Sequence, residues 1–401
     1  MKSSQNSQTD WNGDAPHDAA GFKSPPTEEL EALSPEQLIG LRTWVEVDVC
    51  ALVINLQLIR KRVHPARLLL TVKKDAYGHG LVPVARAAET ARVDYLGVAC
   101  VGEGLALRSA GVTMPILNLG AALDEELDGA IANGIELTVA TLDEAKQVAA
   151  TAQRLGRPAR VHLKIDTGMG RLGLFPEQLL DQIDAMAALG DLEWVGLYSH
   201  LADCPANAQL TDAQLDRFRR VADAVREWLG FRHLGASCAI GDRRLHFDML
   251  RVGIAAYGGD PIAPDCEPVM SLKSRLVFIK DFPPGRPISY GATYVTTEPT
   301  RVGVVAVGYG NGYPRLASNR GHVLIAGRPA AILGRVCMDH VMVNLNEHPG
   351  AQVGDPVLVF GRDGDGVLPA WTVAEWAETI SYELLCCAGM MNPRVHVRTG
   401  E

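Results

Sequence analysis

Several features that would identify a protein class are missing from this sequence of 401 residues. Its eight cysteines include the adjacent pair Cys386 and Cys387 but no Cys-x-x-Cys spacing, so the pattern predicts neither a zinc site nor a disulfide framework, and no metal is expected. No run approaches the ~20 apolar residues that a membrane span needs, and the opening residues lack the apolar core of a signal peptide. We therefore expect reduced thiols in a soluble, cytoplasmic protein with no membrane partner.

Clustered positive charge is also missing. The formal net charge is −9 at pH 7, and basic residues gather only in local runs such as Arg60-Lys61-Arg62. A protein that binds a phosphate backbone needs a basic stripe, so nucleic acid is not an expected partner. The chain has 47% hydrophobic and 21% charged residues, which is the composition of an ordinary soluble enzyme. Its length suits two domains, or a barrel with an addition.

Three regions follow one another along the chain. Residues 1–42 are polar with little periodicity and are expected to form a flexible leader. Over 43–275 short apolar strands alternate with helical patterns, and eight strands separated by helices favour a closed parallel barrel. Over 276–401 short strand runs punctuated by Gly, Asn and Pro predict a β-rich domain with one helix near 373–386. The expected fold is therefore α/β: a (βα)8 TIM-like barrel followed by a C-terminal mostly-β domain. The eight expected strands are 67–73, 95–100, 115–119, 136–140, 160–166, 193–199, 233–237 and 250–256.

Lys73 and Lys74 follow the first barrel strand. Neighbouring side chains on a strand point to opposite faces, so only one of these lysines can enter the barrel. A lysine at a strand end, with Tyr77 and His79 behind it, suggests an amine held inside a site, and the chemistry most in need of such an amine is a Schiff base. The alternative is a solvated lysine pair, which is the commoner fate of this residue.

A glycine-rich turn after the strand at 160–166 presents Arg171. A guanidinium there suits a carboxylate or phosphate, although a structural ion pair between Asp166 and Arg171 is a comparable reading. Other polar or glycine-flanked residues occupy strand ends and turns, and each is weak evidence alone because isolated polar residues are usually only hydrogen-bonded structural groups. These further candidates are His200, Ser237, Arg251, Gly253, Tyr290 and Tyr309.

Taken in order, these segments resemble the alanine racemase family, which combines a pyridoxal-phosphate barrel with a β-domain. The likeness runs from Thr43 to Arg398, nearly the whole chain beyond the leader. The most specific pieces are 73–80, 163–173, 248–258, 289–294 and 334–339.

The resemblance implies pyridoxal 5′-phosphate as the cofactor and interconversion of L- and D-alanine by two bases, which would supply D-alanine as a peptidoglycan precursor. It makes Lys73 both the residue bonded to the cofactor and one base, and Tyr290 the opposing base. It also implies a homodimer in which Tyr290, Tyr309 and Met338 come from the partner subunit. The implied cofactor contacts are Lys73, Tyr77, His200, Ser237, Arg251, Gly253, Ile254 and Tyr309, and the implied substrate contacts are Arg171 and Met338.

Two positions qualify the likeness. Lys164 stands where several members carry a carbamate. Met390 stands where many members have a tyrosine near the phosphate and the substrate entrance, so a preference for alanine over serine or larger amino acids is left open. Smaller departures are Lys74, Ala236, Val252 and Asn311.

Three other functions compete with an alanine racemase. The first is a broad-spectrum or serine-preferring amino-acid racemase with the same machinery. The second is a decarboxylase on the same two-domain plan, which would be expected to place an acidic residue at the pyridine nitrogen, where Arg251 stands here. The third is a non-catalytic pyridoxal-phosphate-binding protein, but such proteins typically lack the β-domain.

Overall fold

An eight-stranded parallel sheet forms the first part of the structure, a computed structural model that describes residues 40–397. The strand order is β8-β7-β6-β5-β4-β3-β2-β9, and the backbone N–H of Arg251 donates to the carbonyl of Gly235 at 3.2 Å, which joins the two ends into a barrel. All eight predicted strands are present, but two are displaced: the strand predicted at 233–237 ends at His233, and the one predicted at 250–256 ends at Val252. They are β2 (Arg67–Thr71), β3 (Tyr95–Val98), β4 (Ile116–Asn118), β5 (Ile135–Val139), β6 (Ala159–Lys164), β7 (Leu192–Tyr198), β8 (Phe231–His233) and β9 (Met249–Val252).

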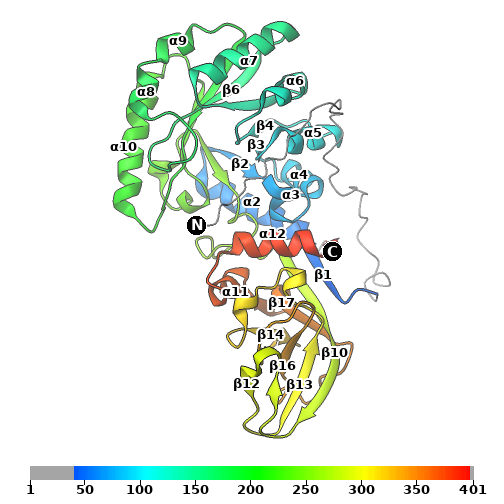
Figure 1. Cartoon of the computed structure of the whole chain (residues 1–401). Coiled ribbons are helices and arrows are strands. Elements are labelled where there is room, and N and C mark those ends of the chain that lie inside the picture. Colours follow the sequence, from blue (N-terminus) through cyan, green and yellow to red (C-terminus); the bar gives the residue numbers. More distant parts are fainter. Residues whose placement is uncertain (1–39, 398–401) are drawn as a thin grey trace, which may run out of the picture.

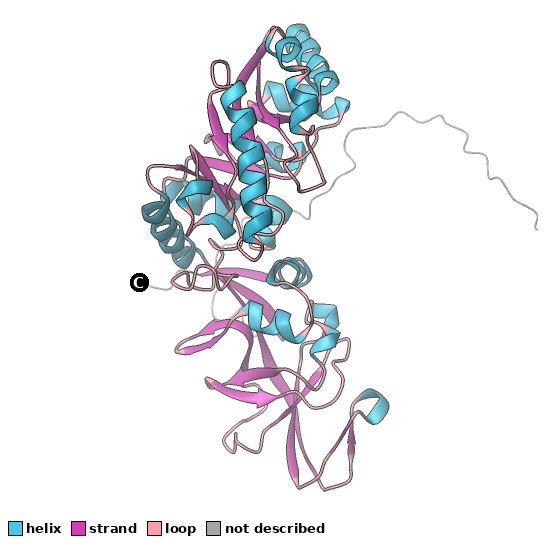
Figure 2. Cartoon of the chain, turned by 90° about the vertical axis from the view of Figure 1, so that its left-hand side faces the viewer, coloured by secondary structure: helices cyan, strands magenta, loops and turns pink. Residues whose placement is uncertain are grey.

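Helices pack around this barrel (Figures 1 and 2). Several begin with the caps that their sequences encode: Asp48 accepts from the first turn of α2, and Thr141 with Glu144 forms a capping box at α7. The helices are α2 (Val49–Val63), α4 (Leu81–Thr90), α5 (Val101–Ser109), α6 (Asp124–Ala132), α7 (Leu142–Leu155), α8 (Pro176–Leu180), α9 (Ile183–Ala187) and α10 (Ala208–Ala224).

A second, nine-stranded sheet forms the β-rich domain, with the central order β15-β14-β17-β10-β1-β19. β13 and β16 extend it from β10, β18 pairs with β17, and β11 with β12 forms a separate hairpin. The strands are β10 (Met270–Phe282), β11 (Pro287–Ile288), β12 (Tyr294–Val295), β13 (Thr300–Val305), β14 (His322–Ile325), β15 (Arg328–Ala331), β16 (Val341–Asn344), β17 (Pro356–Asp363), β18 (Gly366–Leu368) and β19 (Arg394–Val397).

The first strand of the chain, β1 (Thr43–Asp48), belongs to this second sheet and not to the barrel. It pairs antiparallel with β10 and parallel with β19. The sequence assigned 43–275 to the barrel, so this boundary needs correction at both ends: residues 43–48 cross to the second sheet, and β10 already begins at Met270. The predicted leader, residues 1–42, lies almost entirely outside the described residues.

Two helices, α11 (Ala370–Trp376) and α12 (Ser381–Met391), replace the single helix expected at 373–386. The break coincides with Glu378, whose φ of 54° is incompatible with a continuing right-handed helix. α12 lies between the two domains (Figure 1) and approaches the turn after β2 so closely that a Cβ atom on Gly389 would stand 2.0 Å from the carbonyl oxygen of Gly78. No helix within residues 40–397 combines the length and the apolar character that crossing a membrane demands.

Candidate active site

Lys73 opens an unusual left-handed turn at the carboxyl end of β2. The four residues 74–77 all have φ between 53° and 55° although none is glycine, a conformation that costs energy at each position. Side-chain contacts hold the turn: Asp75 accepts from the backbone N–H of Leu81 at 2.6 Å and forms an ion pair with Arg394, and Glu103 accepts from the backbone N–H of Lys74 at 2.6 Å. Strain of this kind is typical of sites where one side chain must be presented in one direction.

The turn separates the two lysines that compete in the sequence. Lys73 is half-buried, whereas Lys74 is exposed. Burial, together with the nearby Arg171 cation, lowers the pKa of Lys73, and within residues 40–397 its amine has no ion-pair or hydrogen-bond partner. Of the pair, Lys73 is therefore the lysine with the features of a reactive amine.

Four of the predicted cofactor contacts meet beside this turn. The hydroxyl of buried Tyr77 lies against Gly253, and Ser237 Oγ accepts from the backbone N–H of Gly253 at 3.0 Å and of Ala255 at 3.3 Å. The backbone N–H of Ile254 is fully buried yet has no acceptor within the described residues. An unsatisfied N–H beside two hydroxyls is an arrangement that suits an anion.

Arg251 lies on β9 with its guanidinium buried and extensively hydrogen-bonded. Nη1 donates to His233 Nδ1 and to the His233 carbonyl, both at 2.9 Å. Nη2 donates to the carbonyls of Ser199 at 2.7 Å and Leu234 at 2.9 Å, and it lies 3.4 Å from His200 Nδ1. In the part of the chain that the structure describes, Nε makes no hydrogen bond, so one N–H of a rigidly held cation remains available to a ligand.

The centre of the site is strongly electropositive. Burial and the cations Arg251, Lys164 and Arg171 lower the pKa of His200 to about 2, so this imidazole is neutral. Burial and the same two arginines lower the pKa of Lys164 to about 7. Such a site favours anionic groups and neutral amines.

Arg171 is exposed on the loop after β6. The structure does not contain the alternative ion pair with Asp166: that carboxylate instead accepts from the backbone N–H groups of Gly168 and Met169, each at 2.8 Å, and of Arg171 at 3.1 Å. Burial opposes ionisation of Asp166, but these backbone donors outweigh it and lower its pKa. The aspartate therefore shapes the loop and leaves the guanidinium of Arg171 available.

The remaining predicted residues lie on the β-rich domain. Tyr290, Tyr309 and Met338 are 70%, 41% and 54% exposed. Their loops interlock, because the backbone N–H of Tyr309 donates to the Cys337 carbonyl at 3.1 Å and Ser289 Oγ donates to the Arg335 carbonyl at 2.6 Å. Tyr290 lies in the turn between β11 and β12, whereas the Tyr309 loop lies against α12, where Asn392 Nδ2 donates to the Asn311 carbonyl at 2.9 Å. Within residues 40–397 none of the three residues makes a hydrogen bond or ring contact with Lys73.

Sequence reasoning missed some neighbours of the site. The ring of Tyr382, on α12, lies 5.7 Å from the ring of Tyr77. Met390, which the resemblance singles out, lies on the same helix and is 70% exposed. The buried residues Glu136, His162 and His233 form a chain that reaches Arg251. Glu136, His162 and His233 could have been found from the sequence, because each is a polar residue inside an otherwise apolar barrel strand.

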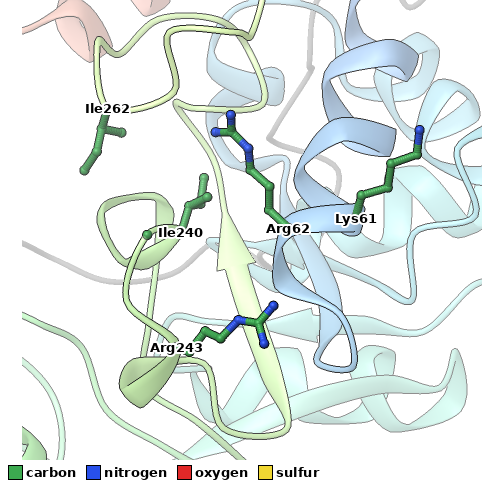
Figure 3. Close-up of a pocket in the computed structure, with 6 residues that line it drawn as sticks. Lys61, Arg62, Ile240, Arg243 and Ile262 are labelled. Atoms are coloured by element: carbon green, nitrogen blue, oxygen red, sulfur yellow. The ribbon is translucent and has the colours of Figure 1, made fainter.

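Surface hollows do not coincide with the predicted residues. One hollow of about 420 Å³ lies between α2 and the loop after β8, lined by Arg62, Arg243, Ile262 and others (Figure 3). Another, of about 470 Å³, lies beside the Tyr309 loop and includes Asn311 and Asp339. None of the predicted catalytic, cofactor or substrate residues lines either hollow.

Pyridoxal phosphate, the group implied by the resemblance, can be tested against these residues. It needs an amine for its aldehyde, donors for its phosphate and a partner for its pyridine nitrogen. Lys73 offers the first, Tyr77, Ser237 and the unsatisfied N–H of Ile254 offer the second, and Arg251 Nε offers the third. The residues present fit the group.

Fold and site together define a class: a two-domain protein in which a parallel barrel presents a lysine amine at its carboxyl end and a β-rich domain follows. Family models agree with this division. "Alanine racemase, N-terminal domain" matches residues 47–261 and "Alanine racemase, C-terminal domain" matches residues 269–396. This chain belongs to the alanine racemase family.

Individual relatives resemble the chain over most of its length. The alanine racemase of Cutibacterium acnes is 40% identical over 351 residues, which cover 85% of this chain and 94% of the relative. That of Halothermothrix orenii is 36% identical over 363 residues, 88% of this chain and 96% of the relative. The solved structure of the Clostridium difficile 630 alanine racemase matches with a TM-score of 0.82 at 35% identity, covering 90% of this chain and 97% of the other.

Proposed function

We propose that this protein is an alanine racemase that uses pyridoxal 5′-phosphate to interconvert L- and D-alanine. One arrangement carries the proposal: three kinds of group meet at the carboxyl end of the barrel. They are the Lys73 amine, which has no partner within residues 40–397, the anion-binding groups around Ser237, and buried Arg251 with one spare N–H. When bound, the cofactor supplies an electron-withdrawing ring that acidifies the Cα proton of an attached amino acid.

Each end of the cofactor has its own residues. Tyr77, Ser237 and the backbone at Gly253 and Ile254 would hold the phosphate, joined by the partner subunit's Tyr309. Arg251 would face the pyridine nitrogen. An arginine cannot readily protonate that atom, so it limits electron withdrawal into the ring and favours return of the proton to Cα over side reactions.

Inversion requires one base on each face of Cα. Lys73 would act on one face, and its lowered pKa makes the neutral, proton-accepting amine more accessible. The partner subunit's Tyr290 would act on the other. A tyrosine normally titrates near 10, so cationic Arg251, acting through His200, would help to stabilise its anion.

Substrate contacts would come from both subunits of a homodimer. The exposed Arg171 guanidinium suits the substrate carboxylate, and the backbone of the partner subunit's Met338 would lie beside it. The exposure of Tyr290, Tyr309 and Met338 supports this arrangement, because a dimer would cover them. We also propose that the enzyme works in the cytoplasm and supplies D-alanine for peptidoglycan precursors.

The experiment that tests this function uses purified protein reconstituted with pyridoxal phosphate. Chiral chromatography of L-alanine, L-serine and L-lysine reactions would measure inversion, with Lys73→Ala as the control. We expect rapid inversion of alanine and none by the variant. Bound cofactor with no inversion of any of the three would contradict the racemase and support a binding protein or a decarboxylase.

A broader racemase is the second candidate, and the exposed Met390 favours it. A long unbranched side chain stands where many family members have a tyrosine near the substrate entrance, and it does not pack into the site in this chain. Comparable inversion of alanine and serine in the same panel would favour this candidate over the narrow one.

A further inference from the structure

A chain of hydrogen-bonded polar side chains crosses the barrel interior and ends at Arg251. Glu136 Oε2 lies 2.7 Å from His162 Nε2, His162 Nδ1 lies 3.0 Å from His233 Nε2, and His233 Nδ1 lies 2.9 Å from Arg251 Nη1. The four residues come from β5, β6, β8 and β9, and each is at most 4% exposed. The ring of His162 also packs against Tyr95 from β3, across the barrel.

The chemistry of the four groups allows only one direction of donation. Arginine has no acceptor, so His233 must accept at Nδ1. A neutral imidazole that accepts at one nitrogen donates from the other, so His233 Nε2–H donates to His162 Nδ1 and His162 Nε2–H donates to Glu136. Burial lowers the pKa of both histidines, which is consistent with neutral rings. The chain therefore runs from a cation at one end to a carboxylate at the other.

Glu136 is the acidic group connected with Arg251 in the described structure. Arg251 itself has no carboxylate within ion-pair distance among residues 40–397, and its other acceptors are carbonyls and His200. At its far end Glu136 accepts from Arg160 Nε at 2.9 Å, and Arg160 Nη1 donates to exposed Glu193 at 2.7 Å. The network thus leads from the surface to the cofactor site.

We propose that Glu136 is a positioning residue for the reaction, acting through His162 and His233 to fix a single histidine tautomer that holds Arg251 with its Nε–H directed at the cofactor's pyridine nitrogen. This inference rests on the proposed function. A structural role alone would require only that the buried polar groups be paired. A positioning role requires in addition that the direction of the hydrogen bonds along this chain of side chains affect the reaction.

The first test measures the tautomers in the unmodified protein. With ¹⁵N-labelled histidine, the ring nitrogen shifts of His162 and His233 are expected to show both rings neutral and protonated at Nε2 at pH 7, with assignments from His162→Gln. A charged ring, or protonation of His233 at Nδ1, would overturn the proposal. This measurement works on protein without cofactor, so its result does not depend on whether the racemase assignment holds.

The second test removes the charge of Glu136 but keeps its shape. An amide carries no charge and can donate as well as accept, so in Glu136→Gln only Arg251 still sets the direction of donation, and a His233 ring that reverses loses its hydrogen bond to Nη1. We expect mixed tautomers at His233 and a kcat for alanine lowered by about tenfold with KM little changed, because coupled neighbours of this kind interact by that order. Glu193→Gln, which removes a surface partner of Arg160, is the matched control and should leave both readouts unchanged.

A double variant separates positioning from general damage. If Glu136 acts through His162, the pair Glu136→Gln and His162→Gln should cost no more in kcat than the larger single effect. Additive losses, or an unaltered kcat in a folded Glu136→Gln protein, would show that Glu136 is only a structural partner.

Discussion

The hydroxyl of Tyr77 occupies the space that a side chain at residue 253 would need. A Cβ atom on Gly253 would stand 2.5 Å from Tyr77 Oη and 3.0 Å from its ring carbon Cζ. Tyr77 is only 6% exposed and its ring packs 5.0 Å from that of Tyr257, so it has little room to retreat. The position of the Tyr77 ring therefore requires a glycine at residue 253.

From this contact we predict that Gly253→Ala weakens binding of pyridoxal phosphate. Displacing Tyr77 would remove the hydrogen bond that we propose it donates to the phosphate, and a loss of that kind is worth roughly tenfold in the dissociation constant. A titration followed by cofactor absorbance measures it. Gly241→Ala is the matched control, since a Cβ there meets no atom within 4 Å, and it should bind normally. Equal affinity of the two variants would refute the predicted role of Tyr77.

Subunit complementation tests whether the site is shared. We expect Lys73→Ala and Tyr290→Phe to be inactive or nearly so as homodimers, for lack of one base each. In a mixed dimer, one site would combine the intact Lys73 of one chain with the partner subunit's intact Tyr290. Activity should then return to about half that of the unmodified enzyme in the heterodimer fraction, as half the sites are complete. Mixing that restores nothing would indicate that both bases act within one chain.

The barrel could be predicted from sequence because each parallel strand is a short apolar run bounded by turns. Lys73, Arg171 and Arg251 could be placed near one another because they lie at or near the ends of such strands. The position of β1 could not be predicted. Its pattern fits either sheet, and its partner Leu272 lies more than 200 residues along the chain.

Other parts of the site depend on tertiary contacts that leave no local pattern. The left-handed turn at 74–77 contains no glycine, and contacts from distant residues, Glu103 and Arg394, help to hold it. Glu136 would be expected to face solvent by composition alone, yet it is 3% exposed because His162 and Arg160 bind it. The approach of Tyr382 to Tyr77 likewise follows from the docking of α12 on the barrel.

The loop that carries Arg171 depends on Gly173. Its φ is +114°, and a Cβ atom would stand 2.6 Å from the backbone nitrogen of Asp166, whose N–H donates to the Leu174 carbonyl at 2.8 Å. We predict that Gly173→Ala destabilises the protein by about 1–3 kcal/mol and raises KM for alanine more than it lowers kcat, because Arg171 loses its position. Denaturant unfolding and steady-state kinetics measure the two effects.

Gly170 in the same loop provides the control. Its φ is +69°, but a Cβ there meets nothing within 4 Å. Gly170→Ala therefore carries only the conformational cost, about 1 kcal/mol. If both alanine variants lose the same stability and KM is unchanged in each, the close approach of Gly173 to Asp166 does not affect substrate binding, and the prediction is wrong.

The buried amine of Lys164 makes the stability of the protein depend on pH in a defined direction. Its pKa is lowered from 10.5 to about 7 in the folded state by burial and by Arg251 and Arg171. Between these values the unfolded chain binds more protons, so this group makes stability rise with pH from about 7 to about 10.5. Below pH 7 its destabilising effect is complete, on the order of a few kcal/mol.

Lys164→Met should remove that dependence. We expect the variant to be more stable than the unmodified protein at pH 6, with the difference shrinking towards pH 10, in urea unfolding in buffers free of carbon dioxide. A difference that stays constant with pH would mean that the amine is not buried as a titrating group. Bicarbonate adds a second comparison: a neutral amine can form a carbamate, whose negative charge would sit among Arg251 and Arg171, so bicarbonate near pH 8 should stabilise the unmodified protein and leave Lys164→Met unaffected.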